Sequence, residues 1–233
     1  MGEVDRAREL IEAVNRRAAE LGHAPSMAHP LQAKFFLEMQ RGDAAAALTA
    51  AEALELLGRE HGMPHWRAAA EQFVGWARGR LSDPAARLAA LAEQGMESGG
   101  WFPEALLAEL EFRAQRHDSA LARIDGALAL AGRAERQSDL PFAYLLRGEI
   151  LLGRDPANSA PAEEAFQTAI AVAKQQGARS WGLRAALALA KLYQSTGRPA
   201  DAHAVLARAL EGFSPTPEMP EIAEAISLIE RLT

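Results

Sequence analysis

The stretch LALAKLYQSTGRPADAHAVLARAL, residues 187 to 210, contains two helical patterns of apolar residues on either side of one short polar break. On both sides leucine and alanine recur at three- and four-residue spacing, which places them on one face of an α-helix. The break contains Gly197, a residue type that often ends a helix, and Pro199, one that often begins the next. The stretch therefore predicts two α-helices joined by a tight turn.

The same order of residues occurs in the two preceding segments of the chain. In the quoted stretch a large residue stands beside a small one, followed by an aromatic residue, a turn glycine and a small–large–small series: Leu189, Ala190, Tyr193, Gly197, Ala202, Leu206 and Ala209. The corresponding small and large residues upstream are Gly148 with Phe166 and Ala108 with Ile124. The small residue lets the second helix approach the first, and the large residue fills the space between them. This order is typical of the tetratricopeptide repeat, in which helix pairs must stack to bury their apolar faces.

Short polar breaks, many with glycine or proline, divide the whole chain into about twelve helices of ordinary length. We expect an all-α fold, an α-solenoid of antiparallel helix pairs that forms a tetratricopeptide-like superhelix. Its expected parts are a leading helix over residues 1–21, about five degenerate helix pairs over residues 26–213 and a C-terminal capping helix over residues 217–233. One of the expected breaks, GHAPSMAHP, covers residues 22–30.

The composition disfavours several classes of site and partner. The 233 residues include no cysteine, which removes thiol nucleophiles, Cys-ligated zinc, iron–sulfur clusters and disulfides. The 25 Lys and Arg residues against 31 Asp and Glu residues give a net charge of −6, which opposes the binding of phosphate backbones. The N-terminus lacks the basic start and apolar core of a secretory signal, and no window of about 18 residues is apolar and uncharged. We therefore expect a cytoplasmic protein that binds neither nucleic acid nor a membrane directly.

The candidate catalytic and metal-binding residues have simpler structural explanations. His61 and His65 are four residues apart, but a glycine and a proline lie between them and no H-E-x-x-H pattern is present. Neighbouring carboxylates such as Glu163 and Glu164 are expected on solvated helix faces, whereas a catalytic pair needs two environments that separate its pKa values. We expect no enzymatic activity, no metal and no cofactor.

Two further features are also expected to be structural. The RGD tripeptide at residues 41–43 is explained as a turn between two helices. Three of the four tryptophans, Trp66, Trp101 and Trp181, stand near the start of the first helix of a pair. A large residue at that place packs against the preceding pair, so we favour inter-repeat packing over an aromatic ligand cage.

Residues 144–232 resemble the C-terminal region of a class of bacterial multidomain signalling proteins. The resemblance rests on RGEILL at 147–152, on AEEAFQTAIAVAKQQGARSWGLRAALALAKLYQSTGR at 162–198 and on a final helix after a proline-containing linker. Those proteins join a cyclase-like or winged-helix output domain to an ATPase of the STAND or AAA type, followed by a long tetratricopeptide-like arm. The resemblance implies that this chain corresponds to the arm, which is thought to act as a sensor and docking surface. The chain has no phosphate loop of the form G-x-x-x-x-G-K-[ST], so the resemblance implies no ATPase or cyclase activity here.

The candidate binding surface is the concave face of the solenoid, which the first helix of each pair lines. The residue after each small position, and the residue three positions further on, give six candidates: Glu109, Phe112, Glu149, Leu152, Lys191 and Gln194. Such a surface suits a protein or peptide ligand, and ordinary solvated helix surface is the alternative explanation for these residues. We expect a non-enzymatic interaction module, the regulatory or sensor arm of a bacterial signalling or transcriptional regulator.

The alternative function is a small-molecule-sensing helical-repeat domain. Its pocket would lie in the curve of the solenoid, lined by Trp101, Phe112 and Tyr144. Aromatic and apolar side chains line most small-molecule sites, so the sequence leaves both hypotheses open.

Overall fold

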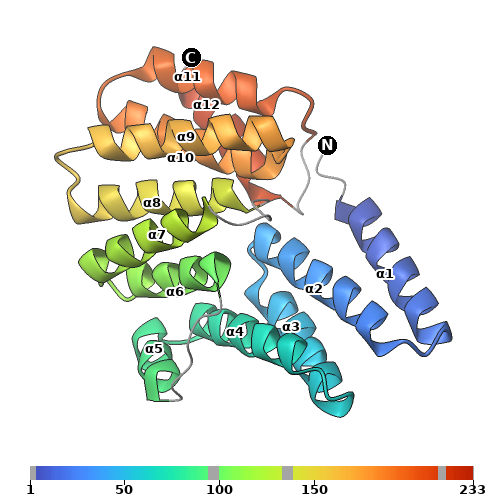
Figure 1. Ribbon diagram of the computed structural model, residues 1–233. Helices are drawn as coiled ribbons and strands as arrows, with labels where there is room; N and C mark the ends of the chain where they lie inside the picture. Colours follow the sequence, from blue (N-terminus) through green and yellow to red (C-terminus); the bar gives the residue numbers. More distant parts are fainter. Residues whose placement is uncertain (1–3, 94–99, 133–138, 215–218, 233) are drawn as a thin grey trace. The chain divides into compact units, whose positions relative to one another are not determined.

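Figure 1 shows a computed structural model of the chain, which describes residues 4–93, 100–132, 139–214 and 219–232. Within these ranges the structure consists of twelve α-helices and contains no strand. The helices divide into two compact units, residues 3–98 and residues 99–233. Each unit is built from helices that pack against their neighbours in the sequence, which is the expected all-α repeat architecture.

The unit of residues 3–98 contains five helices that pack in chain order. Their bounds are α1 Val4–Glu20, α2 Ala24–Arg41, α3 Ala44–Glu60, α4 Pro64–Leu81 and α5 Pro84–Glu93. Aromatic rings also join α2 to α4: the ring of Phe35 stacks on Phe73 with 4.2 Å between centroids and meets Trp76 edge-on at 5.6 Å. All three side chains are buried, so this cluster forms much of the core of the unit.

The unit of residues 99–233 contains three helix pairs and a final helix. The first helices of the pairs are α6 Trp101–Arg113, α8 Leu140–Arg154 and α10 Arg179–Ser195; the second helices are α7 His117–Ala131, α9 Ala160–Gln176 and α11 Pro199–Leu210; the final helix is α12 Pro220–Leu232. Consecutive helices pack against each other, and the first helices also contact one another from pair to pair. The final helix α12 packs on both α10 and α11, where a further first helix would lie.

Close approach of the two helices in a pair follows from the predicted small and large residues. Gly148 on α8 lies so close to the ring of Phe166 on α9 that a Cβ atom at Gly148 would be 2.4 Å from its Cε1 atom. Phe166 is 1% exposed, so its ring fills the space that the glycine leaves. Ala190 and Leu206 are both fully buried at the equivalent positions of α10 and α11. The structure thus confirms the packing role that the sequence assigns to these residues.

Aromatic rings also hold the first helices at a fixed spacing. The ring of Phe142 on α8 lies 6.2 Å from Phe102 on α6 and 5.2 Å from Trp181 on α10, measured between centroids. Trp181 is 4% exposed and Trp101, at the start of α6, is 8% exposed. These two tryptophans are core residues, as predicted, whereas Trp66 is only half-buried and lies against the ring of His29 at 4.9 Å.

The RGD tripeptide at residues 41–43 forms the predicted turn. Arg41 ends α2, Gly42 adopts a left-handed conformation with φ of 76°, and Asp43 caps α3 by accepting a hydrogen bond from the backbone N–H of Ala46 at 2.9 Å. Glycine adopts this conformation without strain, and aspartate is a preferred N-cap. The tripeptide is therefore explained by helix capping.

The expected break over residues 22–30 is wrong for most of its length. The structure begins α2 at Ala24, with a proline in the first turn and Pro30 inside the helix. Pro25 costs little at the helix start, because the N–H that it lacks would have no partner there. Pro30 forfeits one helical hydrogen bond, but both Pro30 and the fully buried Ala28 lie in the core, and their burial offsets that loss. Only residues 21–23 separate the two helices.

Two kinds of element are absent from the described part of the chain. None of its helices combines the length and the apolar character that crossing a membrane requires. No group of three or more His, Asp or Glu side chains in the same part of the chain is placed to hold a metal ion.

Candidate functional site

The six residues predicted on the concave face all lie on first helices of the unit of residues 99–233. Glu109 and Phe112 are on α6, Glu149 and Leu152 on α8, and Lys191 and Gln194 on α10. Glu149, Lys191 and Gln194 are exposed, Phe112 and Leu152 are half-buried, and Glu109 is buried. The exposed members therefore come from α8 and α10, which contact each other directly.

Two of these six residues make contacts that bear on their role. The Nζ atom of Lys191 lies 2.7 Å from a carboxylate oxygen of Glu224 on α12, and both side chains are about half exposed. The ring of Phe112 lies 5.6 Å from the ring of His117, measured between centroids. A Cβ atom added at Gly153 would be 2.9 Å from the Cε2 atom of Phe112. Phe112 of α6 thus packs against the start of α7 and the end of α8, while Lys191 joins α10 to the final helix.

The three aromatic residues predicted to line a small-molecule pocket have separate surroundings. Trp101 is buried against the ring of Phe102 at 5.6 Å, and Phe112 packs as described above. Tyr144 is half-buried on α8. A cavity in the same unit lies elsewhere, beside α10.

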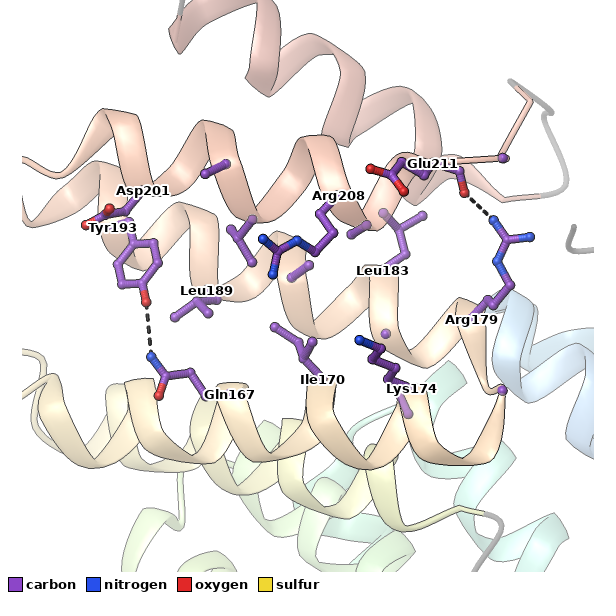
Figure 2. A pocket seen from close by; sticks show the side chains of 18 of the residues that line it. Gln167, Ile170, Lys174, Arg179, Leu183, Leu189, Tyr193, Asp201, Arg208 and Glu211 are labelled. Carbon is purple, nitrogen blue, oxygen red and sulfur yellow. Dashed lines mark hydrogen bonds between the residues drawn. The ribbon is translucent and has the colours of Figure 1, made fainter.

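A groove of about 1060 Å³ runs along α10 between the second helices α9 and α11. Its floor consists of Leu183, Ala186 and Leu189 of α10, which are all buried. Ile170 of α9 and Val205 of α11 form part of the two walls, and both are half-buried. Figure 2 shows α9 on one side and α11 on the other, with the floor of α10 behind them. We call this feature the α9–α11 groove.

Two cations extend into the middle of the groove from opposite walls. Lys174 comes from α9 and Arg208 from α11, and the charged ends of both side chains point into the groove in Figure 2. Both side chains are exposed. Within the described part of the chain, neither has a hydrogen bond or an ion pair. The lining also includes the carboxylates of Asp201 and Glu211, but neither forms an ion pair with Lys174 or Arg208. The groove therefore combines an apolar floor with two cations that have no ion pair in the described part of the chain.

The cations at the two ends of the groove are already engaged. Arg198 lies 2.9 Å from a carboxylate oxygen of Glu163 and 2.8 Å from one of Asp201. At the other end, Arg179 donates a hydrogen bond to the backbone carbonyl of Glu211, and its guanidinium lies 4.5 Å from the centre of the Phe213 ring. These contacts engage the cations at the two ends of the groove, whereas the two cations at its centre have no ion pair in the described part of the chain.

Tyr193 belongs to the network at the Arg198 end. Its hydroxyl donates a hydrogen bond to Glu163 at 2.9 Å and accepts one from the side-chain amide of Gln167 at 3.2 Å. Burial raises the pKa of Tyr193, and the neighbouring Glu163 carboxylate adds to this effect. The hydroxyl thus stays protonated and acts as a structural donor.

The earlier first helices carry bulky or charged residues where α10 has a hollow. Counting from the small residue of each first helix, Ala186 of α10 corresponds to Tyr144 of α8 and to Glu104 of α6. Tyr144 supplies a ring, and Glu104 accepts a hydrogen bond from Arg123 on α7 at 2.6 Å. In α10 the small, fully buried side chain of Ala186 lies at this position, in the floor of the groove.

Charge pairing occupies the neighbouring positions in the same way. Arg147 of α8 lies 2.7 Å from Asp125 of α7, whereas the corresponding residue of α10 is Leu189. Arg123 also pairs with Glu111 of α6 at 3.1 Å. Burial opposes the charge of Arg123, but the hydrogen bonds to Glu111 and Glu104 outweigh it and raise its pKa. At the two positions that Ala186 and Leu189 occupy in α10, each earlier first helix has one charged residue in an ion pair, Glu104 in α6 and Arg147 in α8.

Comparison with known proteins supports the fold and leaves the family open. No protein-family model matches the sequence, and no curated protein matches it. The crystal structure of BtubC (BKLC) from P. vanneervenii matches with a TM-score of 0.53 and 15% identity, over 92% of this chain and 93% of that chain. The crystal structure of the APC/C hetero-tetramer Cut9-Hcn1 matches with a TM-score of 0.57 and 12% identity, over 99% of this chain and 46% of that chain. At these identities the matches show the fold alone, an α-solenoid of antiparallel, tetratricopeptide-like helix pairs, which is the architecture of a helical-repeat interaction module.

Proposed function

We propose that the chain is the regulatory or sensor arm of a bacterial signalling or transcriptional regulator and that it binds a protein or peptide along its first helices. The observation that supports this most is the position of Glu149, Lys191 and Gln194. Glu149 and Lys191 are exposed at equivalent positions of two first helices that contact each other, and Gln194 is exposed three residues further along α10. Repeat proteins commonly bind their partners through such surfaces, because packing fixes the spacing of the helices while the exposed positions vary.

Packing beneath the proposed surface gives it the required rigidity. The rings of Phe102, Phe142 and Trp181 link the three first helices, so residues on neighbouring helices keep their distance from each other. A preorganised surface loses little conformational entropy when a partner binds. The ligand would contact the outer positions and leave the aromatic contacts unchanged.

The ion pair of Lys191 is compatible with partner binding. An exposed pair of this kind contributes at most about 1 kcal/mol, so a carboxylate of the partner can replace Glu224 at little cost. Glu109 is the one predicted carboxylate that is buried, and we therefore assign it to the support of the surface. Glu149 and Lys191 are the two charges expected to contact a partner.

Site-specific photo-crosslinking in the native host tests this proposal. A photoreactive residue at Glu149 or Gln194 should capture the same protein, and one at the exposed position Ala129 on the second helix α7 should not. The identified partner should then bind the charge-reversed variants Glu149→Lys and Lys191→Glu about tenfold more weakly than the wild type. Unchanged affinity of both variants would contradict the assignment of this surface.

The alternative, small-molecule sensing, has one observation in its favour. The volume of the α9–α11 groove, about 1060 Å³, lies just above the usual range of small-molecule sites, about 300–1,000 Å³. Thermal unfolding in the presence of a panel of metabolites and nucleotides tests it. A ligand that binds the native state should raise the Tm in a concentration-dependent way, and a panel without any such shift would argue against this function.

A further inference from the structure

We propose that the α9–α11 groove is a second docking site, which binds an acidic amphipathic helix of a partner protein. This site lies between the second helices and is separate from the first-helix surface of the proposed function. The inference rests on the apolar floor, on the two unpaired cations and on the open shape of the groove. None of these features depends on the residues assigned to the first-helix surface.

The length and lining of the floor suit a helical ligand. The residues from Leu183 to Tyr193 extend about 15 Å along α10, which corresponds to nearly three turns of a helix lying beside it. A helix with apolar residues at positions i, i+3 or i+4, and i+7 would place one side chain at each step along the floor. Ile170 and Val205 would contact the same apolar stripe from the two walls.

The charges in the groove determine the sign of the charge that a ligand should carry. Lys174 and Arg208 approach the centre from opposite sides and have no partner in the described part of the chain. The whole chain carries a net charge of −6, so two unpaired cations facing one groove form a local reversal of its electrostatic field. Carboxylates on both edges of a ligand helix would each find one of these cations, and a basic helix would be repelled.

The openness of the groove favours a peptide over a small anion. Sites for small molecules usually bury most of the ligand, whereas Lys174, Arg208 and Gln167 are all exposed along this groove. A helix can insert its apolar side chains while its outer face stays in water. Single-stranded nucleic acid is also disfavoured, because the aromatic side chain of the groove, Tyr193, is only 6% exposed and is held by hydrogen bonds, so it offers no stacking surface.

Selection from a display library of helical peptides tests the proposal with defined probes. The full-length protein is the target, and the library contains peptides of about four turns with randomised surface positions. Counter-selection against the double variant Lys174→Glu/Arg208→Glu removes peptides that bind elsewhere. We expect enriched peptides to carry an apolar stripe with Asp or Glu on both sides. Failure to enrich any peptide, or enrichment of peptides without carboxylates, would overturn the proposal.

Affinity measurements with one selected peptide distinguish the sources of binding. Lys174→Glu/Arg208→Glu should weaken binding about a hundredfold and reverse its dependence on salt concentration, because salt then screens a repulsion. The matched control is Arg59→Glu/Arg116→Glu, which makes the same charge change at exposed positions outside the groove and should leave the affinity unchanged. An equal loss of peptide affinity in both double variants would show that only the net charge of the protein matters. It would overturn the assignment of Lys174 and Arg208 as contacts of the peptide. Because all four side chains are exposed, equal thermal stability of the variants by circular dichroism is expected.

Competition experiments test the other occupants. Inorganic pyrophosphate and a short single-stranded DNA, each in excess, should not displace the peptide beyond the effect of matched ionic strength. Specific displacement by pyrophosphate would reassign the groove to small anions, and displacement by DNA would reassign it to nucleic acid. Glu149→Lys and Lys191→Glu should leave peptide binding to the groove intact. The experiments therefore test the proposed groove site and the proposed first-helix surface separately.

Discussion

The α8–α9 pair and the α10–α11 pair solve the same packing problem with different residues. In the α8–α9 pair, Gly148 faces the large ring of Phe166. In the α10–α11 pair, the equivalent positions hold Ala190, which is larger than glycine, and Leu206, which is smaller than phenylalanine. The summed volume at the contact is thus similar in both pairs, which is what a densely packed interior requires. The two pairs together teach that the repeat keeps the space between its helices constant and leaves the individual residues free to vary together.

Loss of the large residue should have the largest effect in both pairs. Phe166→Ala should lower the free energy of unfolding by about 3–5 kcal/mol, because the neighbouring glycine offers nothing to fill the cavity. Leu206→Ala should cost about 2–5 kcal/mol and less than the phenylalanine change, since a smaller volume is removed. Urea unfolding gives both values from the midpoint, provided that the m-value stays constant. A loss below about 1 kcal/mol for Phe166→Ala would show that the ring does not fill this space.

A double-mutant cycle tests whether the two residues vary together. Gly148→Ala should cost about 1–3 kcal/mol, because the new Cβ atom would overlap the ring of Phe166. Combining it with Phe166→Leu reproduces the alanine–leucine arrangement of the α10–α11 pair. The double variant should be more stable than the sum of the single changes predicts, with a coupling energy of about 0.5–3 kcal/mol. Strict additivity in the urea unfolding measurements would contradict the idea of shared volume.

Tyr193 marks a polar difference between the pairs, because the corresponding residue of α8 is Leu151. Tyr193→Phe should cost about 0.5–1.5 kcal/mol near neutral pH by removing the hydrogen bonds to Glu163 and Gln167. Tyr144→Phe is the matched control, since the structure describes no hydrogen bond of that hydroxyl. Equal effects of the two changes in urea unfolding would count against the network at Tyr193.

The raised pKa of Tyr193 also predicts a pH dependence. The unfolded tyrosine ionises near pH 10, while the folded hydroxyl remains protonated to higher pH because it is buried. The contribution of the protonated Tyr193 hydroxyl to the free energy of unfolding is therefore fully present below about pH 10. It is lost as the pH rises through the pKa of the folded state. Urea unfolding of the wild type should show this loss as the pH rises above about 10, and Tyr193→Phe should reduce it. An identical pH profile of the two proteins would exclude this residue as the cause.

The smallest expected effect comes from a glycine that has no packing role. Gly126 lies in the middle of α7, and a Cβ atom added there would have no neighbouring side chain within 4 Å, in contrast to Gly148. Gly126→Ala should therefore raise the free energy of unfolding by about 0.4–1 kcal/mol, because alanine loses less backbone entropy in a helix. Thermal and urea unfolding together can resolve a change of this size. Destabilisation by Gly126→Ala would mean that α7 is packed more tightly than the structure indicates.

Much of the fold could be predicted because local signals and packing agree. The turn at Gly197, the glycine–phenylalanine contact at Gly148 and the buried Trp181 all follow from residue types at helical spacing. Pro30 misled the prediction, since a proline usually ends a helix but is tolerated where burial offsets one lost hydrogen bond. Such compensation is a property of the tertiary structure and leaves no local signal.

The candidate site was harder to predict for a related reason. Position in the repeat placed the six candidates on first helices, but it did not distinguish the buried Glu109 from the exposed Glu149. The floor of the α9–α11 groove includes Ala186, a residue type that the alanine-rich sequence contains in many places. Only the alignment of α10 with α8, which has Tyr144 there, makes this alanine informative. A groove is created by what the neighbouring helices leave unfilled, and a single helix pattern does not record that.

The buried tryptophans give each unit its own optical reporter. Trp66 and Trp76 belong to the unit of residues 3–98, and Trp101 and Trp181 belong to the unit of residues 99–233. Variants that retain only Trp76 or only Trp181, both nearly inaccessible to solvent, would report the melting of one unit at a time through the shift of their fluorescence emission. If the two emission changes coincide, the chain melts as one cooperative block; if they separate, each unit has a stability of its own, and the energies given above for Phe166 and Gly148 belong to the second unit alone.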